Sequence, residues 1–279
     1  MKTIVLLAAV AAFSLATPLD LKELSKLGVE AQQAAPVNND LKVPELVTYN
    51  NAVDLYSAAS QTVFNCLRNN GYGVAFLRVY KPDGSGVVDQ DGIANVKTAY
   101  NANMGVEVYA TPSTASSKPG YQQFDESYTA LRNAGINVRT IWLQVTSPIN
   151  WGSNQQYNIN LISSFLNRAK TYNVNVGIYT NWYDWSQITG SWSGWTSSQL
   201  VSLWYWNANG VGPNAESTAT FADFNAFGGW TQAAVKQYGL QYQLCGATFN
   251  RNIYPAGTSV LSRSFASADG EIVVGNVIA

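Results

Sequence analysis

The sequence predicts an α/β fold, an irregular TIM-like (β/α)5(β)3 barrel of parallel strands. Up to residue 180, short runs rich in β-branched residues alternate with longer helical patterns, which is typical of a parallel sheet covered by helices. After Thr180 the pattern changes, because three short strands follow without long helices between them. Five β/α units and a C-terminal run of bare strands together indicate a closed barrel whose last units lack helices.

Each element follows from a local pattern of apolar residues and end signals. Strands are short β-branched or aromatic runs, whereas helices have apolar residues at helical spacing and stop at signals such as Asn70-Gly71 and Gly135. In chain order the predicted elements are strand 52–55, helix 61–70, strand 73–80, helix 93–103, strand 105–110, helix 122–134, strand 138–145, helix 157–172, strand 174–179, and the bare strands 203–206, 235–238 and 247–249.

The N-terminal segment has the features of an export signal. Lys2 precedes an apolar run that is too short to span a bilayer, and Ser14-Leu15-Ala16 has the small-x-small pattern of a cleavage site. We therefore expect a signal peptide at 1–16, a linker or pro-segment at 17–46, the barrel at 47–255 and a C-terminal tail at 256–279 with no clear element. The expected location is secreted, extracellular or in lysosome-like or secretory vesicles, with no membrane association after signal removal.

Two cysteines, Cys66 and Cys245, lie in the part that would be exported. An even pair in an oxidising compartment predicts one disulfide. The alternative is two buried free thiols.

Composition excludes several kinds of chemistry. The chain has no histidine, so Ser-His-Asp and Cys-His nucleophile pairs and His-ligated metal sites are excluded. Charged residues are only 12% of the chain and the net charge is −1, which argues against nucleic-acid binding. We expect no cofactor, no metal and a monomeric protein, and any catalysis must use carboxylates, Lys, Tyr or amides.

Reactive groups of a parallel barrel lie at the carboxyl ends of its strands. The carboxylates predicted near that end are Asp54, Asp83, Glu107 and Asp184. On the fourth predicted strand, the i and i+2 residues Gln144 and Thr146 point to one side. Two carboxylates there would make an acid and base pair of the glycosidase type, but both side chains are neutral.

Several short motifs, in this order and spacing, resemble glycoside hydrolase family 25, and the branch most similar is the secreted lysozymes of amoebae and nematodes. The resemblance covers roughly residues 47–255. Its motifs are VDLYS at 53–57, CLRNNGY at 66–72, IWL at 141–143, VGIYT at 176–180, LWY at 203–205, FGGW at 227–230 and KQY at 236–238.

This resemblance implies cleavage of the bond between N-acetylmuramic acid and N-acetylglucosamine in peptidoglycan. Family members carry Asp-x-Glu at the end of the fourth strand, where the Glu is the general acid and the Asp orients the substrate acetamido group. Gln144 stands at the position of that Asp and Thr146 at that of the Glu. Asp54 matches the retained acid of the first strand, and Asn250 matches a further Asp of the last strand.

Other residues have two interpretations. Asp54 is either an active-site carboxylate or a structural acceptor at the barrel mouth. Glu107, within an apolar strand, is either a groove residue or the partner of Arg78 in an ion pair. Asp184 is a displaced acid or a solvated loop residue.

Aromatic residues complete the predicted substrate site, because sugar-binding grooves use aromatic faces for stacking. Tyr109, Trp204 and Tyr205 are the candidates beside Glu107, although buried aromatics also simply fill cores.

These observations lead to three hypotheses of function. The first is a secreted lysozyme-like protein that recognises peptidoglycan or a related amino-sugar glycan in antibacterial defence or digestion, with hydrolysis weak or lost. The second is an active muramidase that uses Asp54, Glu107 or Asp184. The third is a non-catalytic glycan-binding or regulatory immune protein.

Overall fold

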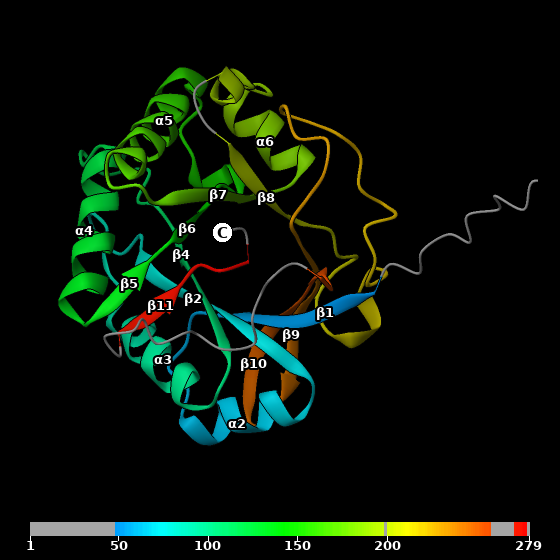
Figure 1. Ribbon diagram of the computed structural model, residues 1–279. Coiled ribbons are helices and arrows are strands. Elements are labelled where there is room, and N and C mark those ends of the chain that lie inside the picture. Colours follow the sequence, from blue (N-terminus) through cyan, green and yellow to red (C-terminus); the bar gives the residue numbers. More distant parts are fainter. Residues whose placement is uncertain (1–47, 198–199, 258–270, 278–279) are drawn as a thin grey trace, which may run out of the picture. The chain divides into compact units, whose positions relative to one another are not determined.

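Eight strands close into a barrel in the computed structural model, which describes residues 48–197, 200–257 and 271–277 (Figure 1). The predicted signal peptide at 1–16 and linker at 17–46 lie outside the described residues, as does most of the predicted tail. Within the described residues, no helix is long and apolar enough to cross a membrane.

The barrel strands hydrogen-bond in a ring, and the pairing of the first two strands closes it. Seven strands are parallel, and the last is antiparallel to both of its neighbours. The strands are β1 (Tyr49–Leu55), β2 (Tyr72–Lys81), β4 (Gly105–Ala110), β6 (Thr140–Gln144), β7 (Asn175–Thr180), β8 (Val201–Trp206), β9 (Val235–Leu244) and β10 (Ala247–Pro255), and the short β3 (Val87–Val88) pairs with β2 outside the ring.

In the part of the chain that the structure describes, five helices lie outside the barrel, one after each of the first five barrel strands (Figure 1). They are α2 (Gln61–Asn69), α3 (Gln90–Asn101), α4 (Gly120–Asn133), α5 (Gln155–Thr171) and α6 (Trp182–Thr189), with short 3-10 turns at Pro148–Asn150, Gly194–Ser197 and Pro213–Ala215. The predicted (β/α)5(β)3 barrel is therefore confirmed.

Helix α6 was not among the helices predicted from sequence. Asn181 caps it by accepting a hydrogen bond from the backbone N–H of Asp184, and Gly190 ends it with a left-handed backbone, φ 64°. Asparagine before a helix and glycine after it are sequence signals for such ends, so this helix could have been found despite its eight residues.

The predicted strand 138–145 is in fact two strands. β5 (Ile136–Val138) pairs in parallel with β11 (Ile272–Val274) outside the barrel, whereas β6 belongs to the barrel. Between them, the N–H of Arg139 donates to Val274 and its carbonyl accepts from Asn175. The chain therefore passes at Arg139 from the two-stranded sheet of β5 and β11 to the barrel sheet.

Aromatic rings fill the middle of the barrel, as inward-facing side chains do in packed barrels. Phe76 lies 4.5 Å from Trp204 and 6.0 Å from Trp142, measured between ring centroids. Gly177 on β7 makes room for them, because a Cβ there would lie 2.1 Å from a carbon of the Trp142 ring. The barrel is therefore a solid core with two separate ends.

Residues 271–277 contribute to the amino end of the barrel. β11 runs beside β5 towards the middle of the ring (Figure 1), Gly275 donates its N–H to Val106, and Val277 is buried. The expectation that 256–279 contains no element is wrong for these residues. Strand β11 pairs with β5, which is distant in sequence, so no local pattern predicts this strand.

The two cysteines form a disulfide, as predicted. Cys245 and Gly246 are the two turn residues between β9 and β10, and both have positive φ, 59° and 73°. Such two-residue turns suit the twist of an antiparallel pair. The bond to Cys66 ties this turn to helix α2 across 179 residues of sequence.

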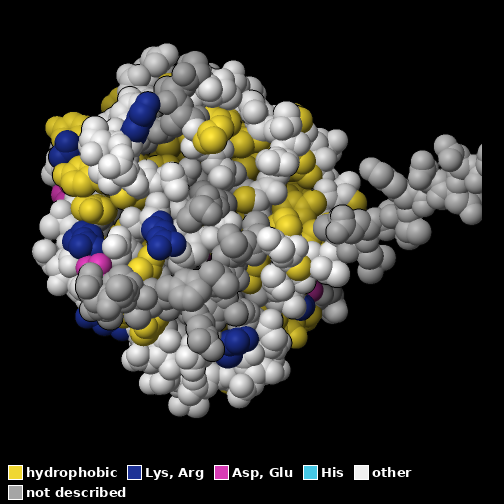
Figure 2. All heavy atoms as spheres, in the orientation of Figure 1, with side chains coloured by type: hydrophobic (Ala, Val, Ile, Leu, Met, Phe, Trp, Pro, Cys, Tyr) yellow, Lys and Arg dark blue, Asp and Glu magenta, His cyan; other side chains and the backbone are white. Residues whose placement is uncertain are grey.

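The face of the molecule in Figure 2 carries separated Lys and Arg side chains rather than one basic patch. This arrangement agrees with the balanced charge of the sequence.

Candidate functional site

The carboxyl ends of the barrel strands bring together polar side chains that are far apart in sequence. Asp54 on β1 is in register with Asn250 on β10. Gln144, the last residue of β6, is in register with Tyr179 on β7. The end of a barrel that most often holds a site therefore gathers the predicted candidates.

Asp54 is held by three side-chain amides. Gln237 and Asn252 each donate to its Oδ1 at 2.7 Å, and Asn250 donates to its Oδ2 at 2.8 Å. The structure thus brings together two predicted residues, Asp54 and Asn250. Gln237 and Asn252 were missed, although Asn252 lies two residues after Asn250 and therefore on the same face of its strand.

The amides around Asp54 are themselves fixed. The Tyr179 hydroxyl donates to Gln237 at 2.8 Å, and the Trp204 indole donates to Asn252 at 2.9 Å. Asp54 is only 3% exposed. Its burial raises the pKa of the carboxyl group, and the three amide hydrogen bonds oppose that rise only in part. Asp54 is therefore a rigidly held carboxyl group with an elevated pKa.

Gln144 and Thr146 also meet, as predicted. The side-chain amide of Gln144 donates to the Thr146 hydroxyl at 2.8 Å, and the Thr111 hydroxyl donates to the Gln144 carbonyl at 2.6 Å. The three side chains line a hollow of about 300 Å³ between the loops that follow β2, β4 and β6, which we call the β6 hollow. Asp54 does not line it.

The chemistry of the β6 hollow follows from its lining. The described residues that form it present hydroxyl, amide, apolar and backbone groups, without a carboxylate or a cation. Such groups give and accept hydrogen bonds, but they do not protonate a glycosidic oxygen near neutral pH.

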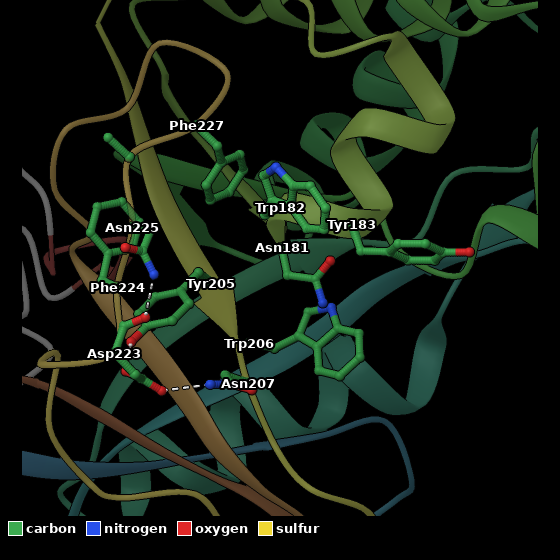
Figure 3. Close-up of a pocket in the computed structure, with 11 residues that line it drawn as sticks. Asn181, Trp182, Tyr183, Tyr205, Trp206, Asn207, Asp223, Phe224, Asn225 and Phe227 are labelled. Atoms are coloured by element: carbon green, nitrogen blue, oxygen red, sulfur yellow. Dashed lines mark hydrogen bonds between the residues drawn. The ribbon is translucent and has the colours of Figure 1, made fainter.

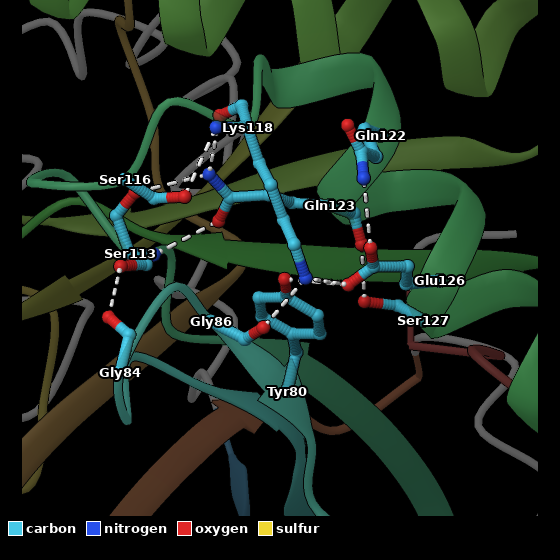
Figure 4. Close-up of polar contacts among 10 residues, drawn as sticks. All are labelled: Tyr80, Gly84, Gly86, Ser113, Ser116, Lys118, Gln122, Gln123, Glu126 and Ser127. Carbon is cyan, nitrogen blue, oxygen red and sulfur yellow. Dashed lines mark hydrogen bonds and ion pairs between the residues drawn. The ribbon is translucent and has the colours of Figure 1, made fainter.

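One wall of the β6 hollow is braced by a polar network (Figure 4). The fully buried Gln123 binds both the N–H and the carbonyl of Ser113, at 2.8 and 3.0 Å. Lys118 donates to Gly86 and to Glu126, each at 2.8 Å, and Glu126 also accepts from Tyr80. Residues 111–118 are therefore held in place before any ligand arrives.

A second hollow, of about 440 Å³, lies beside β8 (Figure 3), and we call it the β8 hollow. Its rim carries two exposed aromatic side chains, Trp182 at 63% and Tyr183 at 55% exposure. Trp206 and Phe227 line it further in, together with Asn181 and other amides. Exposed aromatic faces beside amide groups are typical of sites that bind sugars by stacking and hydrogen bonds.

The outer wall of the β8 hollow depends on a buried lysine. Lys236 is fully buried and donates to both carboxylate oxygens of Asp223 at 2.8 Å, and to the carbonyls of Thr218 and Thr220. The Tyr205 hydroxyl, a predicted binding group, also donates to Asp223. Burial, together with this hydrogen bond, raises the pKa of Tyr205. Lys236 thus fixes the loop that carries Asp223.

Asp184 is not a solvated loop residue, because it is only 3% exposed. Its Oδ2 accepts a hydrogen bond from the Trp206 indole at 2.9 Å, and the backbone N–H of Ser147 also donates to its carboxyl group. Burial raises its pKa, while both hydrogen bonds act in the opposite direction.

Glu107 lies away from this end. It is the third residue of β4, and its carboxyl group accepts from the Trp142 indole and from the backbone N–H groups of Asn276 and Val277. Both interpretations of Glu107 are therefore wrong, because Arg78 pairs with Asp89 instead and the C-terminal segment occupies the carboxyl group.

The remaining predicted aromatics are buried. Trp204 is fully buried and packs against Tyr179, with ring centroids 4.1 Å apart. Its indole can support Asn252, but it offers no free face to a sugar. Tyr109 is 4% exposed, and its burial, together with the nearby charge of Asp54, raises its pKa.

No group of three or more metal-ligating side chains occurs in the part of the chain that the structure describes. The site therefore consists of three parts. They are the carboxyl group of Asp54 with its three amide donors, the β6 hollow with its hydroxyl and amide groups, and the β8 hollow with its aromatic rings.

The (β/α)5(β)3 barrel is a fold that this chain shares with a class of solved structures named as glycoside hydrolase family 25 lysozymes. Solved structures share it: a family GH25 lysozyme from Aspergillus fumigatus superposes with a TM-score of 0.59, at 15% identity, over 77% of this chain and 98% of that one. A bacterial lysozyme from Streptomyces coelicolor gives 0.56, at 20% identity, over 76% and 95%. These similarities establish the fold.

Sequence comparison establishes the family. The family model described as lysozyme-like protein 1 matches residues 45–238. Lysozyme-like protein 1 of Caenorhabditis elegans is 42% identical, over 94% of this chain and 90% of that protein. Probable GH family 25 lysozyme 2 of Dictyostelium discoideum is 31% identical, over 73% and 90%. The chain belongs to the lysozyme-like branch of glycoside hydrolase family 25.

Proposed function

We propose that this protein is a secreted lysozyme-like protein that binds an amino-sugar glycan of the peptidoglycan type and has weak or no hydrolytic activity. One observation carries the proposal. Gln144 and Thr146, which the sequence resemblance assigns to the family's acid positions, are hydrogen-bonded to each other in a hollow whose described lining has no carboxylate.

Loss of hydrolysis follows from the chemistry of glycoside cleavage. A general acid must protonate the leaving oxygen, and a second carboxylate must act as base, nucleophile or stabiliser of positive charge. General acid catalysis alone contributes about 10²- to 10⁴-fold. A threonine hydroxyl is far too weak an acid for the first role, and a glutamine amide has no charge for the second.

The state of Asp54 supports the same conclusion. Its two oxygens already accept three hydrogen bonds from amides. A nucleophile or base needs an oxygen that the substrate can reach, whereas Asp54 is only 3% exposed. Asp54 therefore acts in this proposal as the fixed centre of a hydrogen-bonded cage.

Glycan binding needs shape, aromatic faces and hydrogen bonds, and these features are present. Trp182, Tyr183 and Trp206 offer rings in the β8 hollow, while Thr111, Gln144 and Thr146 offer polar groups in the β6 hollow. Relatives named as lysozymes support peptidoglycan as the glycan, and the signal-peptide pattern supports secretion for antibacterial defence or digestion.

A second candidate function is an active muramidase, and Asp184 is the observation that favours it. Its carboxyl group contacts the N–H of Ser147, the residue after Thr146, and its pKa is raised. A buried acid with an elevated pKa is the form that general acids take in glycosidases.

A peptidoglycan assay distinguishes the two candidates. The purified protein is incubated with insoluble peptidoglycan, and both soluble muropeptides and sedimented protein are measured. We expect co-sedimentation without muropeptide release. Release that disappears in Asp54→Asn or Asp184→Asn would instead establish the active muramidase.

A double variant tests whether the acid positions are assigned correctly. Gln144→Asp with Thr146→Glu restores the family pair, and we expect it to gain muropeptide release. The triple variant that adds Asn250→Asp is the matched comparison, because it restores the third acid. If neither releases muropeptides while both still bind, the assignment of these positions is wrong.

A further inference from the structure

Arg78 brings a positive charge to the inner face of the barrel near its carboxyl end. On β2, Val74 and Phe76 belong to the cluster in the middle of the barrel, whereas Leu77 and Val79 pack on the outside against the helices. Alternate residues of a strand point to the same face, so Arg78 points inwards, one layer beyond Phe76. The proposed function gives this charge no role.

The guanidinium group of Arg78 is held by two neighbours. Its Nε donates to Oδ2 of Asp89 at 2.8 Å, and the side chain of Asp89 is only 3% exposed. The ring of Tyr56, which follows β1, lies against the guanidinium, with 4.9 Å between Cζ and the ring centroid. These two contacts restrict the rotation of the group, so its orientation is set before any ligand binds.

The outer end of the guanidinium remains available to a ligand. Arginine has five N–H donors, and Asp89 accepts from the one on Nε. The other donors, on the two terminal nitrogens, form no hydrogen bond with any residue that the structure describes, and the side chain is 21% exposed. Two terminal N–H groups of this kind match the two oxygens of one carboxylate.

Arg78 lies next to the hollow that the proposed function assigns to the glycan. In the pairing of β2 with β4, Arg78 is in register with Tyr109. Thr111, two residues after Tyr109, lines the β6 hollow, as do Pro82 and Gly84 from the loop that follows β2. A glycan in the β6 hollow therefore has this guanidinium beside it.

We propose that Arg78 binds a carboxylate carried by the glycan, so that the protein prefers amino-sugar chains with carboxylate groups over uncharged ones. This inference rests on the proposed glycan binding and adds the charge of the ligand. Peptidoglycan offers this chemistry from two sources. Muramic acid has a lactyl carboxylate where its stem peptide has been removed, and the stem peptide has carboxylates of its own where it is present.

The pairing with Asp89 determines how this recognition works. Arg78 and Asp89 together carry no net charge, so long-range attraction contributes little. Recognition depends instead on two parallel hydrogen bonds from the end of the guanidinium, which require the planar fork of arginine. A lysine at this position would keep the charge but lose that geometry.

The first test changes only the ligand. Calorimetry measures the affinity of the purified protein for three hexasaccharides of alternating N-acetylglucosamine and N-acetylmuramic acid. One has free lactyl carboxylates, one has methylamides in their place, and one has stem peptides. We expect at least one of the two carboxylate-bearing chains to bind at least about 10-fold more tightly than the methylamide chain. The chain that does so identifies the source of the carboxylate.

Substitutions then assign the preference to one residue. Arg78→Gln should reduce the preference to about 2-fold and leave the methylamide affinity within about 3-fold, whereas Arg78→Lys should keep an intermediate preference. Arg68→Gln is the matched control and should keep the full preference. Arg68 also forms one Nε hydrogen bond, to the carbonyl of Asn103, but it lies on α2 outside the barrel.

A double variant guards against loss of folding. Arg78→Gln alone leaves the buried carboxylate of Asp89 without its cation, which is destabilising. Arg78→Gln with Asp89→Asn removes both charges of the pair, and we expect it to lose the preference as well. Melting temperatures measured beside the affinities show whether each variant is folded.

The outcomes are separable. If neither carboxylate-bearing chain binds more tightly than the methylamide chain, or if the preference survives in both variants without Arg78, the carboxylate site is overturned and glycan binding stands. A wild type that binds neither these chains nor peptidoglycan refutes the proposed function itself. If Arg78→Gln weakens all three chains equally, in step with a lower melting temperature, the role of Arg78 is only structural and the proposal is wrong.

Discussion

The two ends of the barrel each hold a buried carboxyl group, and the two are satisfied in different ways. Asp54, at the carboxyl end, accepts from the side-chain amides of Gln237, Asn250 and Asn252. Glu107, towards the amino end, accepts from the Trp142 indole and from two backbone N–H groups of residues 276 and 277. At the carboxyl end, three side-chain amides surround the carboxyl group beside two hollows. At the amino end, the backbone of the C-terminal segment covers the carboxyl group.

We interpret this difference as the separation of the proposed binding end from a structural end. Amide side chains around Asp54 leave the neighbouring hollows open. Backbone groups bound to Glu107 instead fix the C-terminal segment in the barrel. Under the proposed function, a buried carboxyl group therefore belongs to the binding end in one case and to the closed end in the other.

The largest expected effect comes from removing the acceptor at the structural end. Glu107→Ala leaves three buried donors without partners, and each costs about 1–3 kcal/mol. We expect the free energy of unfolding in urea to fall by about 4 kcal/mol. Asp54→Ala is the matched change at the other end. A loss below about 1 kcal/mol in Glu107→Ala would show that the segment 271–277 does not depend on this residue.

The next effect is a dependence of stability on pH. Burial raises the pKa of Glu107 from 4.5 to about 7. A raised pKa in the folded state means that the stabilisation is complete below about pH 4.5 and is lost as the pH rises to about 7. This loss is on the order of 3 kcal/mol, and burial of Asp54 adds to it in the same direction.

Urea unfolding between pH 4.5 and 7.5 measures this slope. In Glu107→Gln most of the slope should disappear, because that side chain does not titrate. Asp54→Asn should remove the part of the slope that comes from the raised pKa of Asp54. A wild-type stability that rises with pH over this range would show that both carboxyl groups are ionised when buried.

Much of the fold was predictable, because local patterns determine it. Helix α5 and strand β4 follow directly from apolar periodicity and end signals. The break at Arg139 was not predictable, since it depends on pairing with residues 272–274, far along the chain.

The site was predictable in part for the same reason. Asp54, Gln144 and Thr146 follow from strand ends and spacing. The partners of Glu107 are backbone groups at 276 and 277, which have no side-chain signature. For Trp204, the alternation of side chains along a strand predicts which way the ring points but not how deeply it is buried, so its full burial was missed.

A smaller loss of stability is expected from a change in the aromatic core of the barrel, which separates its two ends. In Gly177→Ala the new Cβ would lie 2.1 Å from the Trp142 ring. Overpacking of this kind costs about 2 kcal/mol, and thermal unfolding should show it. The Trp142→Phe background provides the control, because a smaller ring should reduce the cost. An unchanged melting temperature would mean that the ring is free to move.

The smallest effects concern binding and should occur at one end alone. Gln144→Ala removes hydrogen bonds in the β6 hollow, and we expect about 10-fold weaker peptidoglycan binding, equivalent to about 1.4 kcal/mol. Glu107→Gln should leave that affinity within about 2-fold. Equal losses in both variants would remove the distinction between a binding end and a structural end.

The most direct test of the central claim is the amount of soluble muropeptide that the wild-type protein releases from peptidoglycan to which it is shown to bind. We predict retained binding with release no greater than that of the Asp54→Asn, Asp184→Asn double variant. Release by the wild type that this double variant abolishes would contradict the claim that the carboxyl end of the barrel binds glycan without cleaving it.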